Sequence, residues 1–425
     1  MEDVVTVNKL DFSEVKKDID LTTAQNLSEK CLNCKNPRCV SGCPLGINIP
    51  EFIFLIKEGK YEEAYEKISE KSVMPEVCGR VCPQEKTCQA RCIRGLNGES
   101  VRIGDLERFA SNYKKEITNI KENGKKVAVI GSGPASLSCA YHLRKAGFKI
   151  TIFEASHKYG GVLTYGIPNF RLPKNIVNNI FLKLEHMGVI FKNDTLVGKT
   201  ITIKELKKEF DYIFIGTGAG VPKTLDIEGI MAKNVMSANE LLTRINLMNA
   251  PLSDTPLNIP KKAIVIGGGN VACDAARCLV RLGAYVTVCY RKDESNLKMR
   301  QEEYEHALKE GVSFEFEMVP KEIKYDENYS VKSVVFTCND EEKELKCDSL
   351  VIAIGTTHND IILRSSNIKT DENYQIITKE SMTSDKIIFA GGDVIRGNAT
   401  VIDALSDGLS AANKIIEISK QKEVY

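Results

Sequence analysis

The feature that most restricts the fold is a unit of strand, glycine turn, helix and strand that occurs twice. The first copy, KKVAVIGSGPASLSCAYHLRKAGFKITIFEA, covers residues 125–155, and the second, KKAIVIGGGNVACDAARCLVRLGAYVTVCYRK, covers residues 261–292. The glycines of such a unit permit a tight turn, and backbone N–H groups at the start of the helix can then approach a pyrophosphate. The surrounding strands and helix make this pattern more specific than a glycine triplet alone. Two copies in 425 residues predict an α/β chain with two Rossmann-like domains.

The first copy has an acid at the end of its second strand. Gly131 and Gly133 form the turn, Ser136 stands where a third glycine is usual, and Glu154 is predicted to be the last residue of the second strand. A carboxylate at this place accepts hydrogen bonds from a free ribose hydroxyl, so the copy is suited to the adenosine of FAD. A doubly wound domain without a nucleotide is the alternative. The candidate FAD residues here are Gly131, Gly133, Pro134, Ala135 and Glu154.

The second copy ends in cations instead. The second strand is predicted to end at Tyr290, and Arg291 and Lys292 follow it, where they can accommodate the 2′-phosphate of NADP. An ordinary solvated arginine is the alternative for Arg291. Lysine lacks the bidentate fork of arginine, which weakens this phosphate site relative to a pair of arginines. The candidate NADP(H) residues are Gly267, Gly269, Asn270, Val271, Arg291 and Lys292.

Further glycine turns support a flavin. DYIFIGTGAGVP (211–222) reads as a buried strand with a glycine turn, and DKIIFAGGDVIRGNATVIDALSDGLSAANKI (385–415) reads as a strand, a turn and a helix that begins near Thr400. Asp393 can bond a ribityl hydroxyl, and the helix N-terminus can hold negative charge on a reduced flavin ring. The candidates are Gly218, Gly392, Asp393, Ala399, Thr400 and Val401. The five histidines share no ligand spacing, and no side chain is predicted to be catalytic.

Eight of the fourteen cysteines gather in two short stretches, CLNCKNPRCVSGCP (31–44) and CGRVCPQEKTCQARC (78–92). Cysteine followed by proline is typical of ferredoxins, and two 4Fe–4S clusters need eight ligands. Two four-cysteine zinc sites are the alternative, although only Cys31 and Cys34 form the short knuckle that such sites favour. Apolar residues at helical spacing on both sides of Gly59 predict two helices between the stretches. The other six cysteines are expected to be small packing residues.

The composition is that of a globular protein, with 43% apolar and 27% charged residues and a net charge of +1. This balance gives no indication of binding to nucleic acid or to a membrane surface. No apolar run is long enough to span a bilayer, and the N-terminus MEDVVTVNKLDF lacks a basic region followed by an apolar core. A cytoplasmic location is therefore expected.

The order of cysteine stretches, FAD turn, NADP turn and AGGD segment resembles the small (beta) subunit family of NADPH-glutamate synthase. GGVLTYGIPNFRLPKNIV (160–177), GTGAGVPKTL and AGGDVIRGNATVIDA carry this resemblance, which covers residues 25–420. Within the family the likeness is closest to the large subunit of NADH-dependent reduced ferredoxin:NADP⁺ oxidoreductase. The N-terminal part of dihydropyrimidine dehydrogenase is similar too. The chain departs from its relatives at Ser136, at Lys292, in the segment NLKM (296–299) and in a shorter stretch between Val331 and Leu350.

The resemblance implies a helical domain with two 4Fe–4S clusters (1–115), an FAD domain (124–223 and 357–425) and an NAD(P)H domain inserted in it (224–356). It also implies an interlaced ligand pattern. The first ligand set comprises Cys31, Cys34, Cys39 and Cys92, and the second ligand set comprises Cys43, Cys82, Cys88 and Glu107. Cys78 is left as a non-ligand. Gly161, Val162 and Arg171 are implied to lie along the flavin.

The implied activity is that of an NAD(P)H oxidoreductase that passes electrons from FAD through the clusters to a partner. That partner would be a glutamate synthase large subunit or a flavoprotein subunit of the ferredoxin-NAD reductase type, and ferredoxin itself is a further candidate partner. A self-contained NADPH-dependent reductase and the electron-input subunit of a dihydropyrimidine dehydrogenase are alternatives, although the carboxylate of Glu107 stands where pyrimidine-reducing relatives have glutamine. A non-enzymatic redox scaffold is a third alternative, which the intact glycine turns disfavour.

Overall fold

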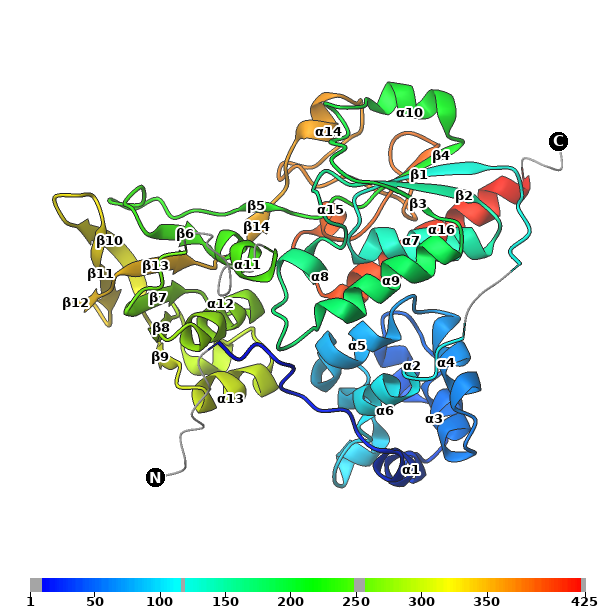
Figure 1. Ribbon diagram of the computed structural model, residues 1–425, viewed down its shortest axis with the longest axis horizontal. Helices are drawn as coiled ribbons and strands as arrows, with labels where there is room; N and C mark the ends of the chain where they lie inside the picture. The colour runs from blue at the N-terminus through cyan, green and yellow to red at the C-terminus, as the bar shows by residue number, and fades with distance from the viewer. Residues whose placement is uncertain (1–9, 116–118, 248–256, 422–425) are drawn as a thin grey trace. The chain divides into compact units, whose positions relative to one another are not determined.

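The computed structural model describes residues 10–115, 119–247 and 257–421 (Figure 1). It divides into two compact units. Unit 1 comprises Met1–Glu14, Thr164–Phe170 and Val221–Thr356, and unit 2 comprises Val15–Leu163, Arg171–Gly220 and Thr357–Tyr425. The first glycine turn and both cysteine stretches belong to unit 2, whereas the second glycine turn belongs to unit 1.

Unit 2 contains a parallel sheet with the strand order β15-β4-β1-β2-β3. Its strands are β1 (Lys126–Ile130), β2 (Lys149–Phe153), β3 (Ile190–Lys192), β4 (Tyr212–Ile215) and β15 (Ile388–Ala390). The central strands are almost wholly buried, which explains why they read as continuous apolar runs rather than as alternating ones. β2 ends one residue before the predicted Glu154, and its counterpart in unit 1, β8 (Tyr285–Cys289), ends one residue before the predicted Tyr290.

Helices cover both faces of this sheet. Figure 1 shows α7 (Pro134–Lys145), α9 (Lys174–His186) and α16 (Val401–Gln421) on one face and α10 (Ile203–Glu209) on the other. α16 packs tightly on α7, because a Cβ atom at Gly408 would lie only 2.1 Å from the Ala135 carbonyl oxygen. The remaining short helices here are α8 (Val162–Tyr165), α14 (Ile361–Arg364) and α15 (Asp393–Arg396).

The cysteine stretches lie in a helical segment of unit 2. Its elements are α1 (Leu21–Glu29), α2 (Arg38–Gly42), α3 (Ile49–Lys57), α4 (Tyr61–Ser69), α5 (Pro75–Val81), α6 (Ile103–Ala110) and the 3-10 turns η1 (Gln84–Lys86), η2 (Gln89–Arg91) and η3 (Ile93–Leu96). Gly59, with φ of +74°, separates α3 from α4, so the two predicted helices are confirmed. The thiols lie on short helices and on the turns between them, a backbone that can bring cysteines distant in sequence together.

The helical segment is fastened to the sheet layer of unit 2. Tyr141 of α7 donates a hydrogen bond to the Ser69 carbonyl oxygen at 3.0 Å, and the Lys183 ammonium of α9 donates to the Val73 carbonyl oxygen at 3.1 Å. The Ser406 hydroxyl of α16 donates to the Pro44 carbonyl oxygen at 2.9 Å. These parts therefore form one compact unit, and the domain bounds drawn within it from the sequence stay a prediction.

Unit 1 repeats the same sheet plan, with the strand order β6-β13-β7-β8-β9. Its parallel strands are β6 (Val235–Ser237), β7 (Lys262–Ile266), β8 (Tyr285–Cys289), β9 (Ser313–Glu315) and β13 (Ser349–Ile352). A second, antiparallel sheet holds β10 (Val319–Tyr325), β11 (Val331–Cys338) and β12 (Glu341–Lys346), and β5 (Val221–Pro222) pairs with β14 (Thr356–Thr357). The helices are α11 (Ala238–Leu247), α12 (Asn270–Arg281), α13 (Gln301–Lys309) and the turn η4 (Glu294–Asn296).

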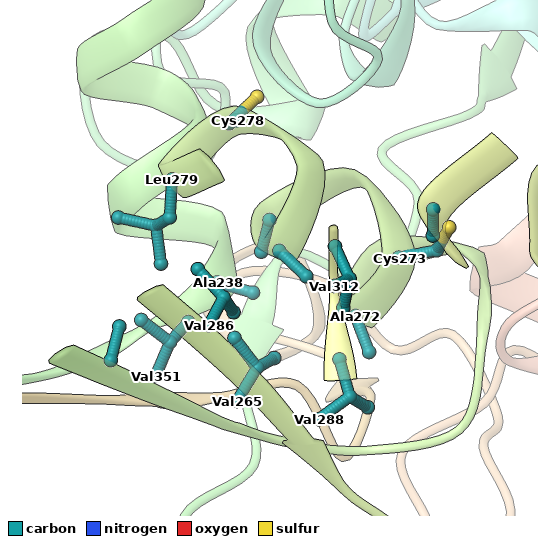
Figure 2. Packing of buried hydrophobic residues seen from close by; sticks show 14 of the residues in the cluster. Ala238, Val265, Ala272, Cys273, Cys278, Leu279, Val286, Val288, Val312 and Val351 are labelled. Atoms are coloured by element: carbon teal, nitrogen blue, oxygen red, sulfur yellow. The ribbon is translucent and has the colours of Figure 1, made fainter. Parts of the chain in front are cut away.

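The core of unit 1 lies between α12 and the strands β7 and β8. Figure 2 shows Cys273 and Cys278 among the valines and alanines of this core, and neither cysteine is exposed. Five of the six cysteines outside the two stretches are buried and Cys338 is half-buried. The packing role predicted for them is thus confirmed for five.

The two sheets show how one Rossmann-like domain is inserted into the other. The chain leaves the first sheet after β4, forms the sheets of unit 1, and returns to add β15 next to β4. The predicted α/β architecture with an inserted second domain is confirmed.

Candidate nucleotide and iron–sulfur sites

The first glycine turn forms an open cradle at the N-terminus of α7. Gly131 has φ of +90°, and a Cβ atom there would lie 2.6 Å from the Gly216 carbonyl oxygen, so only glycine fits. At Gly133, the N-cap of α7, a Cβ atom would have no described neighbour within 4 Å beyond its chain neighbours and its own helix. Gly161 lies alongside, and a Cβ atom placed on Gly161 would be 3.3 Å from the Gly133 Cα atom. Exposed backbone at a helix N-terminus fits a pyrophosphate.

Glu154 lies next to this cradle and is engaged by the protein itself. One oxygen accepts the Ser156 N–H at 2.9 Å, and the other accepts the Ser132 N–H at 3.0 Å and the Ser132 hydroxyl. The Ser132 hydroxyl also accepts the Gly160 N–H at 2.8 Å. A carboxylate has about four lone-pair sites, so Glu154 keeps capacity for a ribose hydroxyl.

The AGGD turn closes the cradle from the other side. Gly392 has φ of +79°, and a Cβ atom there would lie 2.9 Å from the Ala135 side chain. The Asp393 carboxylate accepts the Ala399 N–H at 3.1 Å, and burial raises the pKa of Asp393 to about 6. The structure thus brings the predicted residues around Gly131 and those around Gly392 together.

α16 begins where the sequence predicts. The Asp403 carboxylate accepts the Thr400 N–H at 3.1 Å, and the Thr400 hydroxyl accepts the Asp403 N–H at 3.3 Å. These bonds use part of the donor set at the helix N-terminus, next to Ala399 and Val401. Among the other predicted flavin residues, Gly218 has φ of +69° in open space, Val162 is 48% exposed and Arg171 is half-buried.

Three residues of this site were not predicted from the sequence. Ser132 connects Glu154 to Gly160, Asp407 of α16 accepts the Gly392 N–H at 2.9 Å, and the His358 Nε2 lies 2.7 Å from the Asp393 carbonyl oxygen. The sequence contains a weak signal for Asp407. It is an acid within the apolar face of a predicted helix, and a buried acid needs a hydrogen-bond partner. Ser132 and His358 have none, since both depend on contacts between distant segments.

The fold accommodates Ser136 at the position where a third glycine is usual. The Ser136 side chain is fully buried, and its hydroxyl lies 3.4 Å from the Gly216 carbonyl oxygen. Gly216 leaves room for this hydroxyl because it has no side chain. A small residue opposite a second glycine therefore permits the close packing that a third glycine usually provides.

The second glycine turn has the same form in unit 1. Gly267 has φ of +151°, with a Cβ position 2.4 Å from the Ala353 carbonyl oxygen, and Gly269 is open like Gly133. Asn270 begins α12, and its side-chain oxygen accepts the Arg300 N–H at 2.9 Å, whereas Val271 is 43% exposed. The NLKM departure folds back here, because the N–H groups of Lys298 and Met299 both donate to the Gly268 carbonyl oxygen.

Arg291 and Lys292 follow β8 and are both exposed. Neither makes a salt bridge with another residue of the described ranges. Their charges are therefore available to an anionic group at the end of β8, which is where a 2′-phosphate would lie in a nucleotide bound to this turn.

The first ligand set surrounds one cavity. All four thiols line one cavity that is open to solvent, together with Arg38, Arg91 and Arg94. Burial, with Cys31 and Cys92 nearby, raises the pKa of Cys39 to about 11. All four cysteines are only half-buried.

The second ligand set lies deeper. Cys82, Cys88 and Glu107 are buried, and Cys43 is half-buried. Burial, followed by the nearby Glu107 carboxylate, raises the pKa of Cys43 to about 11 and raises that of Cys88 further. A hydrogen bond with Cys78 is the main cause of the raised pKa of Cys82. The structure thus brings together the four predicted members and adds Cys78 beside them.

Glu107 provides a test of whether this region fits a metal cluster. Its Oε1 atom is buried without a hydrogen-bond partner in the described chain, and burial raises the pKa of Glu107 to about 8. An unpartnered buried carboxyl oxygen is costly. An iron atom bound at that oxygen would satisfy it, so the donor set of three thiols and one carboxyl fits a cluster.

Across the described ranges, no three His, Cys, Asp or Glu side chains converge closely enough to hold a single metal ion. The ligands of an iron–sulfur cluster bind different iron atoms, so they are spread around the cluster rather than around one ion.

Comparison with protein families gives two matches that divide the chain as the sites do. The pyridine nucleotide-disulphide oxidoreductase family matches residues 125–408. The family described as dihydropyrimidine dehydrogenase domain II, 4Fe-4S cluster, matches residues 8–119. The glutamate synthase [NADPH] small chain of Escherichia coli is 32% identical over 96% of this chain and 94% of its own length.

The chain belongs to the glutamate synthase small-chain family. That of Azospirillum brasilense is 30% identical over 97% of this chain and 92% of its own length. The NADPH-Fe(3+) oxidoreductase subunit beta of Geobacter sulfurreducens is 30% identical over 91% of this chain and 64% of its own length. Membership makes this chain an FAD- and NAD(P)-dependent oxidoreductase with a 4Fe–4S domain, as the resemblance implied, and favours iron–sulfur over zinc.

Solved structures share the fold of the nucleotide-binding parts. FprA of Mycobacterium tuberculosis aligns with a TM-score of 0.60 at 18% identity over 70% of this chain and 86% of its own. Thioredoxin reductase of Lactococcus lactis aligns with a TM-score of 0.56 at 25% identity over 70% of this chain and 99% of its own. None of the described helices has both the length and the apolar character needed to cross a membrane.

Proposed function

We propose that this protein is the electron-input subunit of a two-component oxidoreductase. It would take a hydride from NADPH onto FAD and pass single electrons through two 4Fe–4S clusters to a second redox subunit. The observation that carries the proposal is the hydrogen bond between Ser406 and Pro44. It joins α16, which holds the AGGD turn through Asp407, to the residue that follows Cys43 of the second ligand set.

The chain's own residues position the flavin. The N–H groups around Gly133 face the pyrophosphate, Glu154 accepts a ribose hydroxyl, and Asp393 accepts a ribityl hydroxyl. The Gly392 N–H to Asp407 bond keeps the AGGD turn against α7, so both halves of the cradle stay in register. When bound, flavin accepts electrons in pairs from NADPH and releases them singly, which is chemistry that the protein only positions and tunes.

In unit 1 the Gly267–Asn270 turn binds the pyrophosphate of NADPH, and Arg291 with Lys292 binds its 2′-phosphate. The exposure of both cations supports this role, since neither is engaged by a described acid. The preference for NADPH over NADH is expected to rest mainly on Arg291, because its guanidinium bonds phosphate in a bidentate manner.

The two ligand sets differ in depth, and this suggests the order of transfer. The second set is buried next to α16, and the first set is half-buried around an open cavity. Electrons would therefore pass from the flavin site to the second set and then to the first. The exposed first set is suited to deliver them to a partner, a glutamate synthase large subunit or a ferredoxin-linked flavoprotein subunit, in a cytoplasmic setting.

The test is anaerobic purification followed by addition of NADPH. Bleaching of bound flavin, about eight iron atoms per chain and electron paramagnetic resonance signals from two clusters would support the proposal. High activity with small acceptors and no co-purifying protein would favour a self-contained reductase. Absence of flavin bleaching by NADPH, in protein that contains FAD, would contradict the proposal.

A further inference from the structure

Glu76 is a buried acid near the second ligand set that the proposed function does not use. It lies in α5, which ends immediately before Cys82, and only 4% of the residue is exposed. Its Oε1 atom accepts a hydrogen bond from the Lys114 ammonium at 2.7 Å, whereas its Oε2 atom is buried without a hydrogen-bond partner in the described chain. A buried carboxylate that is only partly satisfied costs desolvation free energy, so its presence calls for a reason other than stability.

α5 packs directly on α6, the helix that carries Glu107. A Cβ atom at Gly79 would lie 2.8 Å from the Arg108 Cβ atom and 2.9 Å from the Gly104 carbonyl oxygen, so the two helices are in close contact. Glu76 precedes Gly79 by three residues, which places both on the same face of α5. Glu107 is the chain neighbour of Arg108. The packing therefore brings the side of α5 that carries Glu76 against the helix of a predicted ligand.

The negative charge of Glu76 acts on the groups around it. After burial, it is the second cause of the raised pKa of Glu107. Burial lowers the pKa of Lys183 to about 8, and the charge of Glu76 opposes that lowering. The interaction between two charges weakens with their separation, so both effects agree with the close packing of α5 in this region. Lys114 neutralises only part of the charge, because it bonds only one of the two carboxylate oxygens.

A fixed negative charge beside an iron–sulfur cluster lowers the reduction potential of that cluster. One-electron reduction adds one negative charge to the cluster, and a nearby carboxylate repels it. Because Glu76 is buried, solvent and salt screen this repulsion only weakly. The first ligand set shares its cavity with Arg38, Arg91 and Arg94, and cations have the opposite effect on the potential. The fixed charges beside the two sets are thus opposite in sign.

We propose that the Glu76 carboxylate, held by Lys114, lowers the reduction potential of the cluster at the second ligand set. Glu76 is not a ligand and acts as a positioning residue through its charge alone. This inference rests on the proposed function and deepens it, because it gives electron transfer a direction. In each step the cluster at the second set loses one electron and the cluster at the first set gains it, and the charge of Glu76 favours that outward transfer.

The test is a potentiometric titration of the whole protein with dithionite, in which electron paramagnetic resonance follows each cluster and no NADPH is needed. Glu76→Gln removes the charge and keeps the shape of the side chain, whereas Lys114→Met removes the cation that partly neutralises it. The matched control is the pair of Glu66 and Lys115, which has the same 2.7 Å length but is exposed. Glu66→Gln and Lys115→Met make the same changes in charge within the same unit.

For Glu76→Gln, we expect the reduction equilibrium constant of the second cluster to rise about tenfold, which is a shift of about +59 mV for one electron. Lys114→Met should lower the same potential, and Glu76→Gln/Lys114→Met should resemble Glu76→Gln, because Lys114 acts through Glu76. Glu76→Asp keeps the charge and should restore most of the wild-type potential. The first cluster, and both clusters in the control variants, should change by less than about twofold in equilibrium constant.

Equal potentials of the second cluster in Glu76→Gln and Glu66→Gln would overturn the inference, as would equal shifts at both clusters, which would indicate a general loosening of the segment. If Glu76→Gln does not assemble its clusters, Lys114→Met decides, because an unchanged potential in that variant contradicts the role of the charge. A wild type that holds both clusters but does not bleach its flavin with NADPH would contradict the proposed function, while the dithionite titration would still test Glu76. The two failures are thus distinguishable.

Discussion

The two ligand sets occupy opposite kinds of environment within the same helical segment. The second set is mostly buried, includes a carboxyl oxygen without a hydrogen-bond partner in the described chain, and adjoins Pro44, which α16 holds through Ser406. The first set is half-buried, consists only of thiols and lines a cavity together with Arg38, Arg91 and Arg94. A segment built from similar short helices thus offers one face to the sheet layer of its unit and another face to solvent. The comparison shows that position within the fold, rather than cysteine spacing, separates the environments of the two sets.

The largest expected effect comes from Glu107→Ala. It removes the only non-cysteine member of the second set, so the signal of one cluster should change or disappear while that of the other is retained. Electron paramagnetic resonance of the dithionite-reduced protein measures this. Glu99→Ala, an exposed acid, is the control and should leave both signals intact. Two unaltered signals in Glu107→Ala would mean that the ligand assignment is wrong.

The converse substitution is Cys92→Ser in the first set. We expect about half of the iron to be lost, with flavin bleaching by NADPH retained, because the flavin cradle lies beside the second set. Cys78→Ser serves as the comparison, since Cys78 lies beside the second set but is implied to be a non-ligand. It should retain both clusters. Loss of a cluster in Cys78→Ser would show that this thiol, rather than Glu107, is the ligand.

The inner face of the helical segment can be tested through Lys183. Its ammonium lies 4.6 Å from the centre of the Tyr141 ring and donates to the Tyr65 hydroxyl and the Val73 carbonyl oxygen, both at 3.1 Å. Lys183→Met should lower the free energy of unfolding by about 3 kcal/mol, because it leaves a buried carbonyl oxygen unpartnered. Urea denaturation followed by circular dichroism measures the change. An effect below about 0.5 kcal/mol would show that this face is held by apolar packing alone.

His142 makes the stability contributed by the same face dependent on pH. Burial lowers the pKa of His142 from 6.5 to about 4, with its Nε2 atom 3.1 Å from the Lys71 carbonyl oxygen. Between these values the unfolded chain binds more protons than the folded chain, so stability is fully present above pH 6.5 and falls with decreasing pH. From pH 7 to pH 5 the loss attributable to His142 is about 2 kcal/mol. His142→Gln should unfold with a correspondingly weaker pH dependence, and an identical pH profile in both proteins would contradict this role.

We expect the smallest change in stability from a substitution on the solvent-facing side of the helical segment. Arg94→Ala removes an exposed cation without a described salt bridge, so the free energy of unfolding should change by less than about 0.5 kcal/mol. The same denaturation measurement applies. A larger loss would indicate that Arg94 stabilises the fold, and the two faces of the helical segment would then differ less in their contribution to stability.

Much of the fold could be predicted from the sequence because its signals are local. The turns at Gly131 and Gly267 have the expected strands and helices around them, and Gly59 separates two helices as predicted. The insertion of one sheet into the other was available only from the family resemblance. The neighbouring position of Cys31 and Cys92 had the same source, since 60 residues of intervening chain give no local signal.

The rest of the site depends on contacts that no local pattern encodes. Ser132 occupies the variable position of its glycine turn, and its role arises from Glu154 and Gly160 on other segments. His358 lies next to Asp393 only because β15 returns to the first sheet. Several side chains join the helical segment to the sheet layer, and Tyr141, Lys183 and Ser406 among them each read as ordinary helical residues in the sequence.

The hydrogen bond between Ser406 and Pro44 means that α16 sets the distance between the proposed flavin site and the second ligand set. Electron tunnelling between two centres depends steeply on their separation. α16 starts next to the proposed flavin site, and less than two turns later Ser406 bonds Pro44, which follows the predicted ligand Cys43. Inserting a single residue between Val401 and Ser406 would rotate the serine by about 100° and advance it by about 1.5 Å. The distance between the proposed flavin and cluster sites would thus be set by the helical pitch of α16.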